Sequence, residues 1–319
     1  MEDGGFSITN LKSQMHMLRS LLLFLSESES PKRLFLGTWL GRRLSSRFVA
    51  GEEIDDALQV IRHTHNQGFT VTLDYLGESV RKPEAAEAAC QTYLQLLDRL
   101  AAERLESHVS VKLTQLGLTI DEPMARRNLA RIVERAARYN IFVRVDMEGS
   151  AYAEATLRAV CSIDAPRDVL GVVIQAYLFR SAADIDELVK RGIRIRLVKG
   201  AYQEPPDVAF PHKRDVDRNY RELTQKLLAS EAYHAIATHD EQLIAFTEDL
   251  ARKRGLKQDQ FEFQMLYGVR RQLQRELVKA GWRVRLYVPF GREWYPYFMR
   301  RLAERPANLL FLLRNLIRT

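Results

Sequence analysis

From residue 69 onward the chain alternates between two patterns of hydrophobic and polar positions. Short runs rich in β-branched and aromatic residues predict strands, and longer stretches with apolar residues at helical spacing predict helices. The eight predicted strands are 69–74, 109–113, 141–146, 170–176, 193–199, 234–238, 261–264 and 284–288. The helices predicted after them are 84–106, 122–139, 151–161, 182–191, 214–230, 240–254, 270–280 and 297–305. Helix starts are indicated by capping residues at Asp121, Ser150, Ser181 and Asp240.

Eight units of strand followed by helix predict the α/β class and, within it, a (β/α)8 barrel of the TIM type. An open, doubly wound sheet is the alternative, but no Gly-x-Gly-x-x-Gly motif follows the first strand and no phosphate-loop motif occurs. We expect a helical lead-in over 1–52, the barrel over 53–306 and a C-terminal helix over 307–319. A further helix is predicted near 54–66, where Gly68 ends it.

The composition is that of an ordinary globular protein, with 46% apolar and 28% charged residues in a chain of 319. Lys and Arg number 48 against 41 Asp and Glu, and the basic residues are interleaved with acidic ones. This distribution favours small anionic ligands and argues against nucleic acid as a partner. The two cysteines, Cys90 and Cys161, form no Cys-x-x-Cys pair, so we expect neither a disulfide framework nor a thiolate metal site, and a cytoplasmic location fits.

The N-terminal region carries an apolar stripe formed by Leu18, Leu21, Leu22 and Leu25. The apolar run is far shorter than the ~20 residues that a membrane span needs. No basic region precedes it, so we expect no signal peptide. The stripe is expected to pack on the barrel or on a second copy of the chain, as in a homo-oligomer through the N-terminal helices. Contact with a lipid surface is the alternative.

Polar residues stand at the carboxyl ends of the predicted strands, where active sites of this fold gather. They are Asp74, Lys112, Asp146, Gln175, Lys199, Thr238 with His239, Gln264 and Tyr287. Burying such groups without partners would cost roughly 1–3 kcal/mol each, so a barrel without a ligand has no need of this ring. Individual members have a simpler interpretation as helix caps or structural ion pairs.

Two strand ends carry cations that suit anionic ligands. Lys112, with Asp146 as its expected neighbour, could form a Schiff base, hold an anion or make a structural ion pair, and all three interpretations stay open. Arg196 and Lys199 lead into a tight Gly-Ala-Tyr turn and then into the loop 203–213, which contains three prolines. Such a stiff loop is more typical of a ligand cover than of a linker, and the two cations suit a phosphate or an electron-rich ring.

The last predicted helix places Tyr297, Arg300, Arg301 and Glu304 at positions i, i+3, i+4 and i+7, which share one face. This face would make a clamp for a small carboxylate, and a solvated basic surface is the alternative. His239 has no other histidine at a useful spacing, so we expect a hydrogen-bonding role for it and no metal site.

Eight collinear motifs between about residue 45 and residue 306 together resemble the proline dehydrogenase family. They are Leu-Asp-Tyr-Leu-Gly-Glu (73–78), Val-Lys-Leu-Thr-Gln-Leu-Gly (111–117), Val-Arg-Val-Asp-Met-Glu (143–148), Val-Ile-Gln-Ala-Tyr-Leu (173–178), Arg-Leu-Val-Lys-Gly-Ala-Tyr (196–202), Ala-Thr-His-Asp (237–240), Phe-Glu-Phe-Gln-Met-Leu-Tyr-Gly (261–268) and Tyr-Val-Pro-Phe-Gly (287–291), continuing to Arg300-Arg301-Leu-Ala-Glu-Arg-Pro. Every predicted strand contributes to the resemblance.

The resemblance implies a flavoenzyme that oxidises L-proline to 1-pyrroline-5-carboxylate with FAD, on a distorted barrel whose final helix lies over the mouth. The residues expected to bind or enclose the substrate are Lys112, Asp146, Leu266, Tyr287, Tyr297, Arg300 and Arg301, with Glu78 pairing with Arg300 as a gate. The residues expected to contact the flavin are Met147, Gln175, Arg196, Lys199, Gly200, Ala201, Tyr202, Thr238, His239, Gln264 and Glu304. One position departs from the pattern, because Gln203 stands where larger bifunctional relatives carry a tryptophan near the adenine.

The resemblance also implies partners. The reaction would be the first step of proline catabolism to glutamate, with electrons passed to a membrane quinone and with pyrroline-5-carboxylate dehydrogenase as a candidate partner. A peripheral position at the inner face of the membrane would follow from the quinone. Two rival functions stay open on the residues alone, namely a Schiff-base barrel enzyme and a binding or scaffold protein.

Overall fold

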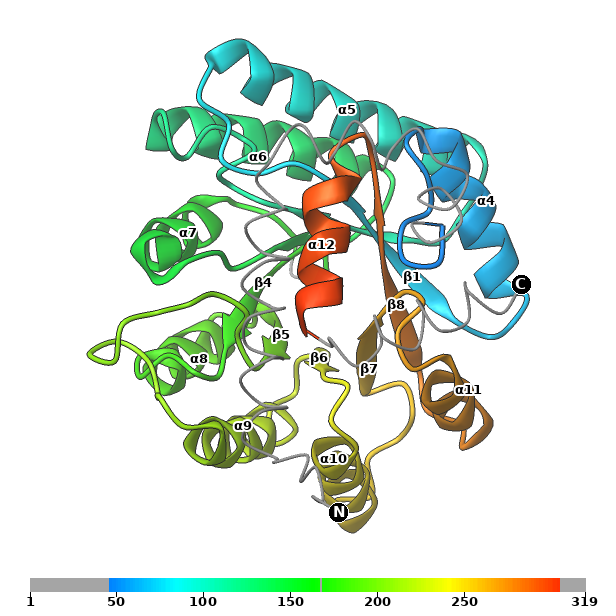
Figure 1. The fold of residues 1–319 in the computed structure, drawn as a ribbon, viewed down its shortest axis with the longest axis vertical. Coiled ribbons are helices and arrows are strands. Elements are labelled where there is room, and N and C mark those ends of the chain that lie inside the picture. The colour runs from blue at the N-terminus through cyan, green and yellow to red at the C-terminus, as the bar shows by residue number, and fades with distance from the viewer. Residues whose placement is uncertain (1–45, 167, 305–319) are drawn as a thin grey trace, which may run out of the picture.

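The computed structural model of the chain describes residues 46–166 and 168–304, and these form a closed barrel of parallel strands inside a ring of helices (Figure 1). The strands are β1 Thr70–Tyr75, β2 His108–Val111, β3 Val143–Val145, β4 Leu170–Gln175, β5 Arg194–Val198, β6 His234–Ala237, β7 Phe261–Leu266 and β8 Val284–Phe290. The helices are α4 Ile54–His65, α5 Pro83–Ala102, α6 Glu122–Arg138, α7 Ser150–Ser162, α8 Ser181–Lys190, α9 Lys213–Leu227, α10 Glu241–Lys253, α11 Arg271–Lys279 and α12 Trp294–Glu304. The predicted (β/α)8 barrel is therefore confirmed.

The first and last strands close the barrel by pairing along the whole length of β1. The register runs from Thr70 opposite Arg285 to Tyr75 opposite Phe290. This pairing explains why β8 extends two residues beyond its predicted end. β7 is also two residues longer than predicted, ending at Leu266, which lies opposite Tyr287 of β8.

Two of the four predicted helix caps are confirmed and two are wrong. The side chains of Asp121 and Asp240 accept hydrogen bonds from the backbone N–H groups of the first turns of α6 and α10. Ser181 instead lies inside α8, and its hydroxyl donates to the carbonyl oxygen of Gln175. Ser150 is likewise the first residue of α7, where Glu204 from a distant loop accepts its hydrogen bonds. A tertiary partner has replaced the local cap at both sites.

Contacts across the barrel identify the side chains that point into it. Arg196 of β5 donates to Ser110 of β2 and to Asp146, which directly follows β3, and Tyr287 of β8 also donates to Asp146. Because these strands are not neighbours, the contacts can only cross the interior. Alternation along each strand then gives the inward-facing polar residues Thr72, Asp74, Ser110, Lys112, Arg144, Asp146, Arg196, Glu262, Gln264, Arg285 and Tyr287. The intervening residues, such as Val71 and Val109, belong to the hydrophobic core.

The amino-terminal end of the interior is closed by buried charge. The Arg285 Nε atom lies 2.8 Å from Glu262 Oε1, and Arg144 is 1% exposed. The Arg144 guanidinium donates to two backbone carbonyls and lies 4.6 Å from the centre of the Phe142 ring. Gly171 provides the space for this arrangement, since a Cβ there would meet the Phe142 ring and the Arg144 guanidinium. These side chains fill the amino-terminal end, and the cavity for a ligand is therefore expected at the carboxyl ends of the strands.

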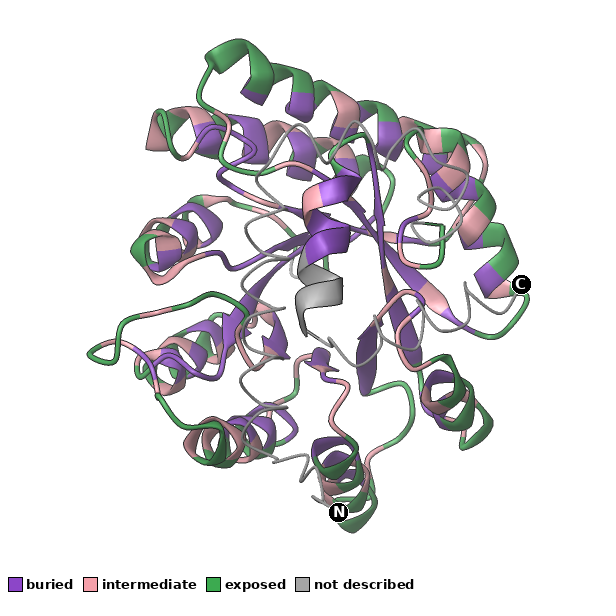
Figure 2. Ribbon diagram, viewed as in Figure 1, coloured by how far each residue is buried: buried purple, intermediate pink, exposed green. Residues whose placement is uncertain are grey.

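The final helix, α12, lies across the barrel instead of joining the outer ring (Figure 1). Its first turns are buried (Figure 2), and Phe298 packs against Trp294 and Phe48 with ring centroids 6.1 and 6.2 Å apart. α4 packs against both β1 and β8, on the outside of the strand pair that closes the barrel. The expectation of a final helix over the mouth is thus confirmed, although α12 begins at Trp294, three residues before its predicted start.

The segment just before α4 runs alongside the end of β8. The backbone N–H of Ala50 donates to the carbonyl of Pro289, and the N–H of Gly291 donates to that of Gly51. The leucine stripe predicted near the N-terminus and the helix predicted over 307–319 lie outside the described residues. None of the described helices is long and apolar enough to cross a membrane.

Candidate active site

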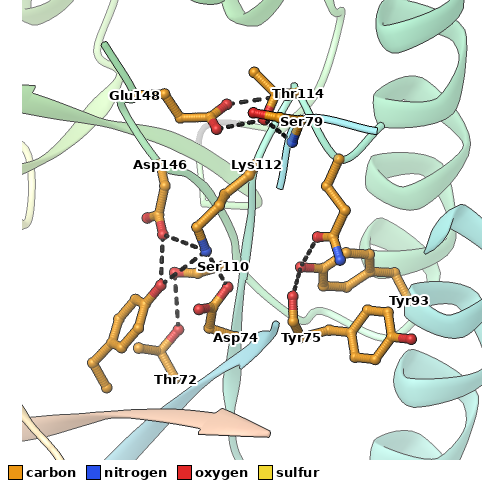
Figure 3. A network of polar contacts seen from close by, with 12 residues as sticks. Thr72, Asp74, Tyr75, Ser79, Tyr93, Ser110, Lys112, Thr114, Asp146 and Glu148 are labelled. Atoms are coloured by element: carbon orange, nitrogen blue, oxygen red, sulfur yellow. Dashed lines mark hydrogen bonds and ion pairs between the residues drawn. The ribbon is translucent and has the colours of Figure 1, made fainter. Parts of the chain in front are cut away.

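Lys112 stands at the centre of a polar network at the carboxyl ends of β1, β2, β3 and β8 (Figure 3). Its Nζ atom lies 2.6 Å from Asp74 Oδ1, 3.5 Å from the Tyr287 hydroxyl and 3.9 Å from Asp146 Oδ2. The prediction that Asp146 neighbours Lys112 is confirmed, but Asp74 is the direct partner. The Asp74 side chain is 1% exposed and that of Lys112 is 14% exposed, so Lys112 is the more accessible member of the pair.

The surroundings keep Lys112 charged. Burial lowers the pKa of the Lys112 ammonium, but the nearby charges of Asp74 and Asp146 more than offset this and raise the pKa overall. Burial and the same two carboxylates hold the pKa of the Tyr287 hydroxyl well above its usual range, so it stays protonated and donates to Asp146 Oδ2 at 2.7 Å. An ammonium held in this way attracts an anion and is poorly suited to act as a free amine nucleophile.

Arg196 extends the network toward β5. Its Nη1 donates to Asp146 Oδ1 at 3.0 Å, its Nη2 donates to the Ser110 hydroxyl at 2.7 Å, and its guanidinium lies 5.1 Å from the centre of the Tyr287 ring. The Arg196 Nε atom is buried and has no hydrogen-bond partner within the described part of the chain. Asp146 is therefore shared by a lysine, an arginine and a tyrosine, which fixes its orientation.

Two glutamines add buried acceptors near the carboxyl ends of β4 and β7. Gln175 Nε2 donates to the carbonyl of Glu148 at 2.7 Å, and Gln264 Nε2 donates to Glu262 Oε1 at 2.5 Å. These bonds fix the orientation of both amides. Each glutamine is left with a buried Oε1 atom that accepts no hydrogen bond from any described residue. Two acceptors and the Arg196 donor thus remain to be satisfied by a polar ligand.

The cations and polar groups at the ends of β5 and β6 are oriented by their neighbours. Lys199 Nζ lies 2.5 Å from Asp217 and 2.8 Å from Asp240. Although burial raises the pKa of Asp240, Lys199 lowers it to about 2 overall. The Thr238 hydroxyl accepts from the N–H of Asp240, and His239 Nε2 accepts from the N–H of Leu266 at 2.9 Å. His239 thus takes part in a hydrogen bond of the kind predicted for it.

The Gly-Ala-Tyr turn follows β5. Gly200 has φ +121° and lies against the Tyr177 ring, which a Cβ at this position would meet. Ala201 is exposed and Tyr202 is 40% exposed, whereas Met147, after β3, is buried. Only a glycine combines this backbone conformation with so close an approach.

The remaining predicted site residues lie on the loops and the helix around the mouth. Glu78 is exposed on the loop between β1 and α5, Leu266 is half-buried at the end of β7, and Tyr297 is buried on α12. The side chains of Arg300, Arg301 and Glu304 lie outside the described part of the structure, so the predicted carboxylate clamp stays a prediction.

Sequence reasoning missed several members of this site. Asp74 was predicted only as a strand end, and Ser110, Thr114 and Glu148 were not predicted at all. Ser110 and Lys112 are two residues apart, as are Asp146 and Glu148, and such pairs share a face in an extended chain. Alternation was therefore the signal that could have found Ser110 and Glu148. No cluster of three or more metal-ligating side chains occurs among the residues described.

Comparisons with known proteins agree on one family. A sequence model described as proline dehydrogenase matches residues 57–314. The chain is 41% identical to proline dehydrogenase 2 of Bacillus subtilis over 298 residues, covering 93% of this chain and 98% of that protein. It is 39% identical to proline dehydrogenase of Deinococcus radiodurans over 280 residues, covering 86% and 90%.

A larger protein shares the fold. The crystal structure of proline utilization A from Bdellovibrio bacteriovorus, inactivated by N-propargylglycine, is similar with a TM-score of 0.80 and 26% identity. The match covers 93% of this chain and only 37% of that one. The bifunctional protein PutA of Escherichia coli is 27% identical over 318 residues, covering 86% of this chain and 24% of that protein.

Proposed function

The chain belongs to the proline dehydrogenase family, and on that premise we propose that it oxidises L-proline to 1-pyrroline-5-carboxylate with FAD as the electron acceptor. Proline dehydrogenase activity, the first step of proline catabolism, is shared by relatives that match nearly the whole chain. The cofactor, the mode of transfer and the roles of individual residues are the proposal. The observation that carries it is the Lys112 ammonium, held at the covered mouth by Asp74 and Asp146.

Lys112 is proposed to bind the carboxylate of proline. The ammonium is charged and fixed, and the Lys112 side chain is 14% exposed, which suits a charge-assisted hydrogen bond to a carboxylate. Arg300 and Arg301 on α12 are proposed to complete the carboxylate site, on the basis of their spacing and of the family. Asp146, Tyr287, Leu266 and Tyr297 are proposed to enclose the ring, with Glu78 pairing with Arg300 as a gate.

The residues around the mouth suit a flavin. Buried acceptors on Gln175 and Gln264 and the Arg196 donor fit a planar ring that alternates donors and acceptors, and Gly200 permits close approach of backbone. The group of residues proposed to hold FAD is Met147, Gln175, Arg196, Lys199, Gly200, Ala201, Tyr202, Thr238, His239, Gln264 and Glu304. FAD, when bound, would supply the hydride acceptor, its N5 atom, for the ring carbon that is bonded to nitrogen and does not carry the carboxylate.

The protein's own task in this reaction is positioning. Lys112 and the two arginines hold the carboxylate, while Tyr287 and Asp146 set the plane of the ring. α12 covers the mouth and limits the entry of water. The interactions within the network orient Asp146 and Tyr287 before the substrate binds, so little reorganisation is needed during the reaction.

The rival Schiff-base function is disfavoured by the same lysine. A Schiff base requires a neutral amine, whereas two carboxylates raise the pKa of Lys112. Treatment with borohydride in the presence of a 2-oxo acid, the kind of carbonyl substrate that a Schiff-base enzyme would take, is expected to leave Lys112 and Lys199 unmodified. A covalent adduct on Lys112 or Lys199 would favour the rival.

The test of the proposed function starts from the purified protein. We expect a yellow protein with flavin absorbance that bleaches when proline is added without oxygen, and a product that o-aminobenzaldehyde traps as the dihydroquinazolinium adduct. A colourless protein that FAD does not reconstitute, or a flavin that proline leaves oxidised, would refute the proposal. A scaffold protein would show no turnover with any amino acid.

The proposal extends to electron transfer and product removal. Reduced flavin must be reoxidised, and a membrane quinone is proposed as the acceptor, reached from the cytoplasm at the inner face of the membrane. Proline-dependent reduction of a soluble quinone, and flotation of the active protein with liposomes, test the two parts separately. A pyrroline-5-carboxylate dehydrogenase is proposed as a partner, and co-purification of the two activities tests it.

A further inference from the structure

The loop between β1 and α5, which carries Glu78, is fastened to the neighbouring β2–α6 loop at two points. Glu78 lies between them and is itself exposed. The two points of attachment are consecutive residues of that loop, Thr114 and Gln115. Figure 3 shows Thr114 with Ser79 and Glu148. A loop that is fixed on either side of one exposed carboxylate can hold that carboxylate over the mouth.

The first attachment is by packing against Gln115. The Tyr93 hydroxyl donates to Gln115 Oε1 at 3.2 Å and also lies 3.4 Å from the carbonyl of Tyr75. The Gln115 side chain therefore lies beside the loop where it leaves β1. Gly77 has φ +151°, and a Cβ there would meet Gln115 Nε2. The loop passes Gln115 as closely as a glycine allows.

The second attachment is a chain of hydrogen bonds that ends on a buried carboxylate. The backbone N–H of Ser79 donates to Thr114 Oγ1 at 2.9 Å, and that of Val80 donates to the Thr114 carbonyl at 3.2 Å. The Thr114 hydroxyl donates to Glu148 Oε1 at 2.5 Å, and the Thr114 N–H donates to Glu148 Oε2 at 3.0 Å. Glu148 is 4% exposed.

The direction of these bonds follows from the atoms. A hydroxyl has one proton, and Thr114 gives it to Glu148, so its lone pairs are left to accept from Ser79. Both oxygens of Glu148 accept hydrogen bonds from Thr114. Burial raises the pKa of Glu148, while the bonds from Thr114 and the charge of Lys112 oppose this rise. Bonds to the ionised carboxylate are about twice as strong as neutral ones, so Glu148 in that form strengthens the hold of Thr114 on the loop.

Ser79 supplies independent evidence that the loop is held. Its φ of +54° places a residue other than glycine in the left-handed region. This conformation costs roughly 1–2 kcal/mol and persists only where the surroundings enforce it. The bond to Thr114 is made by the backbone N–H of this same residue, next to Glu78.

We propose that Thr114 and Glu148 are positioning residues that hold Glu78 in place over the mouth and thereby set the affinity for the substrate. Glu148 is two residues from Asp146 on the same face, so the segment that lines the substrate pocket also anchors the gate. The effect on substrate affinity rests on the proposed function, in which Glu78 is the gate of a proline site. The attachment itself is independent of which substrate is bound.

The experiment compares Thr114→Val, which removes the hydroxyl at constant shape, with Thr114→Ser, which keeps it. The matched control is Thr247→Val, because Thr247 is equally buried and its hydroxyl donates only to Leu243 of its own helix. Hydrogen exchange of residues 76–82 is measured in the purified protein without substrate. We expect Thr114→Val to accelerate exchange there by about fivefold to tenfold, as loss of the bond from the Ser79 N–H to the Thr114 hydroxyl requires, while Thr114→Ser and Thr247→Val leave it unchanged.

Proline kinetics supply the second measurement. We expect Thr114→Val to raise KM by about 5-fold or more and to change kcat by less than about 2-fold, because the loop affects binding and not the transfer itself. Glu148→Gln should do the same to a smaller extent, and it serves if Thr114→Val fails to fold.

Two outcomes would overturn the inference. One is unchanged exchange at residues 76–82, or acceleration spread equally over the barrel. The other is local acceleration with unchanged KM. Failure of the proposed function is distinguishable, since the wild-type protein would then not oxidise proline, whereas the exchange experiment needs no turnover.

Discussion

Asp74 and Lys112 lie 38 positions apart at the ends of neighbouring strands and join at 2.6 Å, with Asp74 the more deeply buried of the two. The two residues have different tasks. Asp74 keeps Lys112 charged and fixed, and Lys112, the more accessible of the two, is proposed to meet an anion. The loss of Asp74 and the loss of Lys112 should therefore have different effects on the protein.

Lys112→Met leaves Asp74 buried without its partner, which should lower the free energy of unfolding by about 3–5 kcal/mol. It should also raise KM for proline by about tenfold or more through loss of the carboxylate contact. The double variant Lys112→Met with Asp74→Asn should recover most of the stability and none of the affinity. Urea unfolding and steady-state kinetics measure the two effects, and recovery of KM in the double variant would contradict the substrate role.

Arg301→Met tests the clamp on α12. A charge-assisted hydrogen bond is worth roughly 1.5–3 kcal/mol, so KM for proline should rise by about tenfold or more. Arg275→Met, at an exposed position of α11, is the control and should leave KM unchanged. Proline kinetics that are the same in both variants would remove Arg301 from the carboxylate site.

The ion pair of Glu262 and Arg285 at the amino-terminal end of the barrel predicts a dependence of stability on pH. Burial raises the pKa of Glu262, but Arg285 lowers it to about 2 overall, below its ordinary value of 4.5. The contribution of the pair is therefore complete above pH 4.5 and is lost as the pH falls toward about 2. Glu262→Gln should lower stability at pH 7 by about 3–5 kcal/mol, and the difference from wild type should shrink as the pH falls. Thermal unfolding from pH 2 to 7 measures this, and parallel curves would contradict it.

Gly200→Ala should damage the turn that is proposed to contact the flavin. Its matched control is Gly255→Ala, since Gly255 also has a positive φ but has nothing within 4 Å of an added Cβ. The control should cost about 1–2 kcal/mol from backbone strain alone. Gly200→Ala should cost more, because the new methyl group meets Tyr177, and it should lower the flavin content per protein. Equal melting temperatures and equal flavin absorbance in the two variants would show that the close approach is unimportant.

The sequence allowed the strands and most of the polar ring to be predicted, because both depend on local patterns. β-branched runs predict strands, and residues at the carboxyl ends of parallel strands meet at one end of a barrel. Asp146 and Tyr287, both predicted strand-end residues, are hydrogen-bonded to each other, whereas the contact between Arg196 and Asp146 was not predicted. The final helix over the mouth was different, since it was expected from the resemblance to a family and its position is not encoded in any local pattern.

The parts that could not be predicted depend on which residues meet across the barrel. Asp74 and Asp146 stand at the ends of the two strands that flank β2, and Lys112 follows β2 directly. The side-chain conformations, and not the register, decide that Asp74 is the closer, at 2.6 Å against 3.9 Å. Serine is a residue type that often caps helices, yet Ser150 and Ser181 each form a hydrogen bond with a residue from another element. Local propensity is overridden at such sites because tertiary contacts contribute more than a single cap.

The position of α12 has a consequence for biosynthesis. A chain is synthesised from its amino end, so all eight strands precede the helix that covers them. The barrel can close through the pairing of β1 with β8 before α12 covers its mouth. α12 begins only four positions after the end of β8, and it can dock only on a barrel that this pairing has already closed. We therefore expect α12 to be the last of the described elements to take its place during folding.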